Sequence, residues 1–285
     1  MDNAAPISRP GVWQIDKIPG YCITLERRPD RWKRFQDQLG IHAMPRMQRF
    51  LGVDGNTLNI RTDPRVSLFT KRNILLKTRR AHEELDSIGG VGCALSHIAL
   101  WRLMIEKNEP LMFIMEDDAV VTADFKDIAN NIIQASPTLS DPKQWDLWLI
   151  GADWATTVPL EADTKLERAY SFWMAHGYVI TQAYARRLLE DVLPIEGHID
   201  MWMSNYAAVH KTRMVATKLL RIPQYTRTTT DIQTSNLSPV CDIPTNYTET
   251  HSLISHVENT IAKTAEVACV IAIGYFVFMH IRKML

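Results

Sequence analysis

Residues 111–118 read LMFIMEDD, an uninterrupted apolar run that ends in three adjacent carboxylates. Apolar runs of this length without a charge are typical of a central strand in a mostly parallel sheet, which is buried on both faces. Ligands of α/β proteins bind at the carboxyl ends of such strands. The sequence therefore predicts a buried strand that carries Glu116, Asp117 and Asp118 to a site at the edge of a sheet.

The acidic triplet (Glu116, Asp117 and Asp118) offers the oxygen ligands that Mg²⁺ and Mn²⁺ prefer when they bridge a protein to substrate phosphates. Because alternate residues of a strand point the same way, Glu116 and Asp118 are predicted to share one metal ion, while Asp117 faces elsewhere. A solvated acidic loop is the alternative for the triplet taken alone. Phosphatases and two-metal nucleases also use carboxylates at strand ends, so the triplet indicates metal and phosphate chemistry first.

Strand and helix patterns alternate on both sides of this strand. Strand patterns occupy residues 19–26, 47–53, 145–150 and 171–181. Helix patterns occupy residues 30–39 (ended by Gly40), 93–107, 124–135 and 183–193. This alternation predicts an α/β fold with a mixed, mainly parallel sheet.

The composition argues against a nucleic-acid-binding protein and against a protein built around zinc or disulfides. Lys+Arg and Asp+Glu balance at 32 each over 285 residues, so no overall field attracts nucleic acid. The four cysteines are widely separated and form no C-x-x-C pair, which indicates reduced thiols rather than a zinc site or a disulfide framework. The N-terminus lacks the apolar segment of a secretory signal.

The C-terminus carries a separate apolar segment. Residues 267–279 contain no charge, and the basic residues Arg282 and Lys283 follow. The wider segment 265–281 reaches the lower limit of about 17 residues for a membrane-spanning helix. We predict a C-terminal membrane anchor, with the preceding chain on the cytosolic side; a buried or interfacial helix is the alternative.

Several segments together resemble one known family, the lipopolysaccharide and collagen glycosyltransferase-like proteins of glycosyltransferase family 25. The resemblance covers roughly residues 18–235, and Gly92-Cys93 with Ser96-His97 and the acidic triplet form its most specific part. The segments that carry it are YCITLERRPDRWKRF at 21–35, FLGVDG at 50–55, GGVGCALSHIALW at 89–101, FIMEDDA at 113–119, AHGYVITQAYARRLL at 175–189 and HID at 198–200.

The resemblance implies a GT-A-type nucleotide-sugar transferase fold with a Rossmann-like sheet and Mn²⁺ or Mg²⁺ as cofactor. It implies inverting transfer of galactose or another hexose from a UDP-sugar to a hydroxyl group of a glycan, lipid or protein. We predict that the chain consists of an N-terminal extension (1–17), a transferase domain (18–235), a linker (236–262) and the apolar helix (263–285). The linker and the apolar helix are not part of the resemblance.

The resemblance also assigns roles to individual residues. Glu116 and Asp118 are predicted to hold the metal, and Asp117 to belong to the diphosphate-binding motif. The arginines after the first strand are predicted to bind phosphate, because a guanidinium binds it through two hydrogen bonds. The predicted nucleotide-binding residues, besides Asp117, are Thr24, Arg27, Arg28, Arg31, Gly92, Ser96 and His97. Thr24 departs from the family, which usually has Asn there. The alternatives are a solvated helix start for the arginines, a flexible turn for Gly92 and a structural histidine for His97.

Inverting transfer needs a base that removes the proton of the acceptor hydroxyl, and this base is usually a carboxylate. Asp200 matches a family aspartate and is the predicted base. Asp153, after the strand pattern 145–150, is the alternative; either could instead be a turn or cap residue. Two other functions stay open: an inactive family member that acts as a membrane-tethered binding module, and a metal-dependent phosphohydrolase. The sequence indicates no oligomeric state.

Overall fold

The computed structural model describes residues 12–225, apart from 79–80, 82 and 218, together with Ile232. Its sheet has six strands in the order β2-β1-β3-β5-β4-β6. Only β5 is antiparallel to its neighbours β3, β4 and β6, and the other pairs in the described chain are parallel. The predicted mixed, mainly parallel α/β sheet is therefore confirmed. The strands are β1 Gly20–Thr24, β2 Met47–Leu51, β3 Leu111–Glu116, β4 Leu147–Pro159, β5 Glu167–Thr181 and β6 Met214–Ala216.

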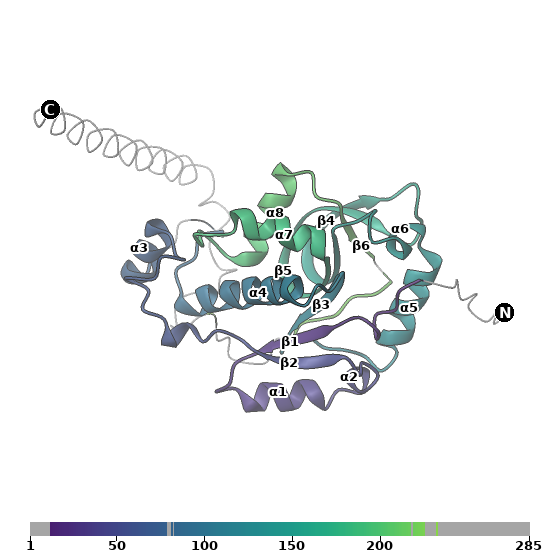
Figure 1. The fold of residues 1–285 in the computed structure, drawn as a ribbon, viewed down its shortest axis with the longest axis horizontal. Helices are drawn as coiled ribbons and strands as arrows, with labels where there is room; N and C mark the ends of the chain where they lie inside the picture. Colours follow the sequence, from purple (N-terminus) through teal and green to yellow (C-terminus); the bar gives the residue numbers. More distant parts are fainter. Residues whose placement is uncertain (1–11, 79–80, 82, 218, 226–231, 233–285) are drawn as a thin grey trace, which may run out of the picture.

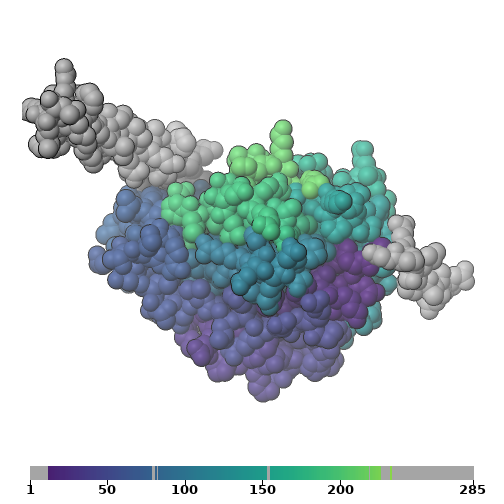
Figure 2. Space-filling view, in the orientation of Figure 1, coloured from purple at the N-terminus to yellow at the C-terminus, as the bar shows by residue number. Residues whose placement is uncertain are grey.

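Helices cover both faces of the sheet (Figure 1). One core lies between the sheet and α4, α7 and α8, and the other includes side chains of α1, α5 and α6. In the space-filling view the region near residue 100 lies between the first part of the chain and the part near residue 200 (Figure 2). The helices are α1 Pro29–Gln36, α2 Leu39–His42, α3 Leu68–Leu76, α4 Ile88–Glu106, α5 Phe125–Ala135, α6 Pro137–Ser140, α7 Gln182–Asp191 and α8 Ile199–Val209.

Strand β3 is the central strand that the sequence predicts. Met112 and Ile114 point into the core under α4, while Phe113 and Met115 point into the core on the opposite face. All four side chains are fully buried. Because β3 lies between β1 and β5, the acidic triplet at its carboxyl end projects from the most enclosed part of the sheet.

Helix α4 begins at Ile88, five residues before the start that the sequence pattern predicts. Ser87 caps the helix, because its side-chain oxygen accepts a hydrogen bond from the Gly90 amide at 3.1 Å. The glycines at 89, 90 and 92 therefore lie in helical turns rather than in a loop. By length and composition α4 could cross a membrane, but 61% of its apolar window is buried in the protein core.

The predicted membrane anchor at 263–285 and the linker at 236–262 lie outside the described residues, as do the first eleven residues of the extension 1–17. The anchor therefore stays a prediction from sequence.

Asp146 joins three elements just before β4. Its carboxylate accepts hydrogen bonds from the Arg213 amide at 2.9 Å and the Arg213 guanidinium at 3.1 Å, and lies 2.8 Å from the Arg187 guanidinium on α7. Burial opposes ionisation of Asp146, but these hydrogen bonds and charges outweigh it and hold the pKa of the carboxyl below its ordinary value. Asp146 thus ties the start of β4 to the chain before β6 and to α7.

Asp146→Asn is expected to lower the free energy of unfolding by about 1–3 kcal/mol near neutral pH, because the arginines lose a charged acceptor. The folded-state pKa lies below the unfolded value of about 3.9, so this stability is present above that pH. It is lost as the pH falls through the folded-state pKa, and the difference between wild type and variant should shrink. Urea unfolding at several pH values measures it. Asp127→Asn, at a mostly exposed carboxylate, is the control; a pH-independent difference would contradict the assignment.

Candidate functional site

The three carboxylates of the triplet contact two different helices, α4 and α1. Strand β3 ends at Glu116, and the chain turns at Asp117 and Asp118. Glu116 points to α4, where its Oε1 lies 3.3 Å from His97 Nε2. Asp117 and Asp118 both contact Arg31 on α1. The predicted alternation, with Asp117 facing away from the other two, is therefore wrong, because the extended strand stops before the two aspartates.

Arg31 lies between the two aspartates and is largely buried. Its Nη2 is 2.7 Å from Asp117 Oδ1 and 3.0 Å from Asp118 Oδ2, and only 9% of its side chain is exposed. Helix α1 begins with Pro29 at its first turn directly after β1, which places Arg31 beside the end of β3. In this structure, the contacts of Arg31 at the triplet are with its carboxylates, while phosphate binding stays a prediction.

One carboxylate oxygen of Asp118 is hydrogen-bonded, and the other has no partner within the described residues. Its Oδ2 accepts a hydrogen bond from Gln224 Nε2 at 3.0 Å, and its backbone oxygen accepts one from the Tyr225 amide at 2.7 Å. Its Oδ1 is buried and has no hydrogen-bond partner within the described residues. Burial, followed by the charge of Glu116, raises the pKa of Asp118 to about 7.

These residues fit a hard divalent cation. Asp118 Oδ1 has no hydrogen-bond partner within the described residues and could accept a cation, and Glu116 is close enough to influence the ionisation of Asp118. Burial opposes ionisation of Glu116, but the hydrogen bond from His97 and nearby positive groups keep its pKa below its ordinary value. That Glu116 and Asp118 hold the ion stays a prediction.

His97 is buried and contacts both Tyr178 and Glu116. It has no exposed surface, and its Nδ1 lies 2.8 Å from the hydroxyl of Tyr178, which also accepts a hydrogen bond from Trp101 Nε1 at 3.1 Å. The other ring nitrogen faces Glu116. This chain of contacts sets the orientation of the Glu116 carboxylate from within the core.

Ser96 and Gly92 attach α4 to the loop after β2. The Ser96 hydroxyl accepts a hydrogen bond from the Val53 amide at 2.8 Å and donates one to the Gly92 carbonyl at 2.7 Å. A Cβ on Gly92 would overlap the Val53 carbonyl oxygen and lie 2.8 Å from the Gly55 amide nitrogen. The contacts of both residues here are with the protein itself, and a role in nucleotide binding stays a prediction.

Gly92→Ala is expected to destabilise the fold by about 1–3 kcal/mol, because the added methyl group meets rigid backbone atoms. Gly90→Ala is the matched control in the same helix, since its Cβ would meet only the side chains of Leu85 and Ser87. Thermal unfolding should show the larger loss for Gly92→Ala. Equal losses would mean that the loop after β2 moves aside without cost.

Thr24, Arg27 and Arg28 lie at the same edge of the sheet as the triplet, because Ile23 of β1 pairs with Glu116 of β3. Thr24 is buried at the end of β1. Arg27 Nε is 2.7 Å from Asp54 Oδ2, and Arg28 Nη2 is 2.9 Å from Asp30 Oδ2. The structure thus brings these three predicted residues to the site. Asp54 and Asp30 partly offset the charges of the two arginines there.

Asp200 lies in the first turn of α8 and is fixed by backbone amides. Its Oδ2 accepts a hydrogen bond from the Met174 amide at 2.7 Å, and its Oδ1 accepts one from the Met201 amide at 2.8 Å. After burial and the charge of Glu116, the charge of Asp200 also raises the pKa of the Cys93 thiol, which places Asp200 near α4. Asp153 lies in β4 opposite Trp173, and its side chain is outside the described structure.

The sequence analysis predicts no role at the site for one segment that lies beside the triplet. Residues 219–225, which we call the strap, run past the triplet: the Val120 amide donates to the Pro223 carbonyl at 2.8 Å, and the Ile222 amide donates to the Ile150 carbonyl at 2.9 Å. Arg34 stacks over the ring of Tyr225 at 4.4 Å. The alternation of buried Leu220 and Ile222 is the signal that could have revealed it.

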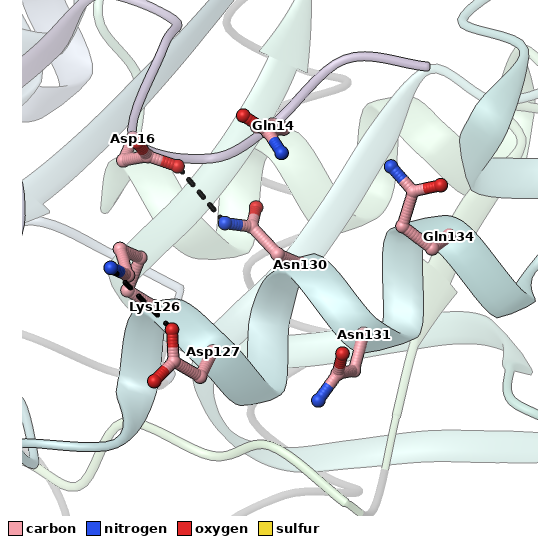
Figure 3. A pocket seen from close by; sticks show the side chains of 7 residues that line it. All are labelled: Gln14, Asp16, Lys126, Asp127, Asn130, Asn131 and Gln134. Carbon is pink, nitrogen blue, oxygen red and sulfur yellow. Dashed lines mark hydrogen bonds and ion pairs between the residues drawn. The ribbon is translucent and has the colours of Figure 1, made fainter. Parts of the chain in front are cut away.

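A separate polar pocket of about 400 Å³ lies between residues 14–16 and α5 (Figure 3). Asn130 there donates a hydrogen bond to Asp16 at 2.9 Å. None of the predicted site residues lines this pocket, so it is distinct from the triplet. Its lining residues are Gln14, Asp16, Lys126, Asp127, Asn130, Asn131 and Gln134.

Most of this chain matches the model of one known protein family. The family model described as glycosyltransferase family 25 (LPS biosynthesis protein) matches residues 17–203. A glycosyltransferase 25 family member of Aedes aegypti is 26% identical over 208 residues, which cover 65% of this chain and 31% of that protein. Procollagen galactosyltransferase 1 of Danio rerio is 25% identical over 250 residues, with coverages of 84% and 38%.

One of the proteins that this chain is similar to is named as inactive. The inactive glycosyltransferase 25 family member 3 of Homo sapiens is 26% identical over 197 residues, which cover 65% of this chain and 30% of that protein. The chain thus spans about a third of the length of these curated relatives. The residues that the family model matches include the triplet, His97 and Asp200, but not the strap.

Proposed function

Because the chain belongs to glycosyltransferase family 25, we propose that it transfers a sugar from a UDP-sugar to a hydroxyl group of a glycan, lipid or protein. The observation that carries this proposal is the buried, unpartnered Oδ1 of Asp118 beside Glu116, at the carboxyl end of the central strand. A hexose such as galactose is the proposed sugar, on the strength of the procollagen galactosyltransferase among the relatives.

The proposed cofactor is Mn²⁺ or Mg²⁺, held by Glu116 and Asp118; when bound, it supplies positive charge that stabilises a leaving diphosphate. His97 orients Glu116, while Gln224 and the Tyr225 amide hold Asp118. Arg31 keeps the Asp117 carboxylate in place. The charges of Arg27 and Arg28 at the same edge suit the phosphates of the nucleotide.

Asp200 is the proposed base that takes the proton of the acceptor hydroxyl. Its carboxylate is oriented by the Met174 and Met201 amides, and its negative charge, like that of Glu116, raises the pKa of the Cys93 thiol on α4. A carboxylate held in one orientation by amide donors is suited to receive a proton from a bound hydroxyl. Asp153 stays the alternative base, and its side chain lies outside the described structure.

Attachment to a membrane through residues 263–285, with the transferase domain on the cytosolic side, is a further proposal. It rests on the uncharged segment 267–279 and the basic residues that follow it.

The test of the proposed activity is UDP release by the purified full chain from a panel of UDP-sugars, with Mn²⁺, with Mg²⁺ and with EDTA. We expect release with one hexose donor that stops in EDTA and returns when the metal is restored. Absence of release together with an unfolding temperature that Mn²⁺ and UDP leave unchanged would contradict the proposal. UDP binding without release favours the inactive binding module, and phosphate release from simple phosphate esters favours the phosphohydrolase.

A further inference from the structure

Cys93, His97 and Glu116 bring three different ligand types together beside the acidic triplet. The Cys93 sulfur lies 3.8 Å and the His97 Nε2 lies 3.3 Å from the same Glu116 oxygen. The potential ligand atoms of the three residues all lie within 4.8 Å of one another. We propose that this cluster is a second cation site, selective for a thiophilic divalent ion such as Zn²⁺.

The donor atoms decide which ion the cluster prefers. Thiolate and imidazole ligands favour Zn²⁺, whereas Mn²⁺ and Mg²⁺ prefer the all-oxygen environment of Asp118. In a tetrahedral zinc site, bond lengths of about 2.0–2.3 Å imply ligand atoms about 3.3–3.6 Å apart. The separations of 3.3 and 3.8 Å from Glu116 are close to that range, and the third separation in the cluster is at most 4.8 Å. The spacing of cysteines along the sequence gave no sign of such a site.

The helix and strand around the cluster hold its three potential ligand side chains in place without an ion. Cys93 and His97 are four residues apart on α4, so they project from the same face of a rigid helix. The Tyr178 hydroxyl holds the other ring nitrogen of His97, which is the arrangement that orients metal-ligating histidines. Glu116 reaches the same place from the end of β3.

Charge and access also suit a cation. The Glu116 carboxylate lies against the Cys93 sulfur, so a divalent ion bound between them would offset its negative charge. Cys93 is partly exposed and 19% of the Glu116 side chain is exposed, so two of the three side chains reach the protein surface. A site with three protein ligands and an open fourth position is the usual form of a reactive zinc site.

A consequence follows for transfer, and it rests on the proposed function. Glu116 is shared by the two sites, so Zn²⁺ bound to Cys93 and His97 would draw Glu116 away from Asp118. Zinc would then inhibit UDP release by removing a ligand from the Mn²⁺ site. Zinc binding itself does not depend on whether the chain is an active transferase.

Co²⁺ is the probe, because its bond to a thiolate gives a charge-transfer absorption band in the near ultraviolet. The full chain and two variants, Cys93→Ser and Cys22→Ala, are titrated with Co²⁺ under reducing conditions. Cys22 is buried in β1 in the other core and serves as the matched thiol control. His97→Gln is a fourth protein, since its amide can still hydrogen-bond to Tyr178 while the imidazole ligand is lost.

We expect the band in wild type and Cys22→Ala, its loss in Cys93→Ser, and its displacement by Zn²⁺ but not by excess Mn²⁺. Affinity should fall more than about 100-fold in His97→Gln, because even changes to outer partners of a metal site cost about 10–100-fold. A band that persists in Cys93→Ser, or no band in wild-type protein whose folding is verified by circular dichroism, would overturn the proposal. Neither readout requires a donor sugar, so an inactive transferase leaves the test intact.

Discussion

Asp118→Asn is expected to lower Mn²⁺-dependent UDP release by at least about 100-fold, the effect of removing one well-placed electrostatic group from an active site. The amide keeps the size of the side chain and its contact with Gln224, but it carries no charge to hold the ion. The loss should appear with every donor that the wild type uses, because the defect lies in the cofactor site rather than in sugar recognition.

Stability distinguishes this loss of activity from simple unfolding. Burial raises the pKa of Asp118 to about 7, so stability falls as the pH rises from the unfolded pKa of about 3.9 to about 7, and the full cost is present above that pH. A neutral amide avoids this cost. In EDTA near pH 8, Asp118→Asn should therefore unfold at the same temperature as wild type or higher. Asp127→Asn, at an exposed carboxylate on α5, should keep full activity. Unchanged UDP release in Asp118→Asn would remove the basis of the proposed function.

Arg31→Met is expected to lower the free energy of unfolding by about 3–5 kcal/mol, because it leaves two buried carboxylates without their positive partner. The methionine side chain fills much of the space of the arginine stem, so lost packing contributes little. Added Mn²⁺ should raise the unfolding temperature more in the variant than in wild type, since the ion replaces part of the missing charge.

Denaturant unfolding of a double-mutant cycle measures this coupling. Combining Arg31→Met with Asp118→Asn should restore part of the lost stability, because one of the two uncompensated charges is removed as well. Lys33→Met is the control on the same helix, where both partners of the Lys33–Asp37 pair are mostly exposed. Additive losses in the cycle would show that Arg31 does not stabilise the fold through Asp118.

The sequence predicts the parts of this fold that local pattern determines. The run at 111–115 becomes β3 because an uncharged segment of strand length has few alternatives to burial. Element ends are less certain. The predicted helix over 30–39 stops at Gln36, and Gly40 lies inside α2 instead of ending α1. Gly40 has a packing role there, because a Cβ would overlap the backbone of Thr122.

The site shows the same division between local and distant information. The triplet and its place at a strand end follow from eight consecutive residues. The contacts that define its electrostatics join residues far apart in the chain, such as Arg31 with Asp118 and Gln224 with Asp118. No periodicity along the sequence specifies such pairs, because they depend on how strands are ordered in the sheet. The cluster at Cys93 escaped prediction for the same reason.

The strap also determines where the folded unit ends. The family model matches the chain only as far as residue 203, and a boundary drawn there would remove β6 and the strap. Asp118 would lose its contacts with Gln224 and Tyr225, and β4 would gain an unpaired edge where β6 now lies. Any shortened form of this chain must therefore extend at least through Tyr225 to retain the whole site, whatever the limits of recognisable homology.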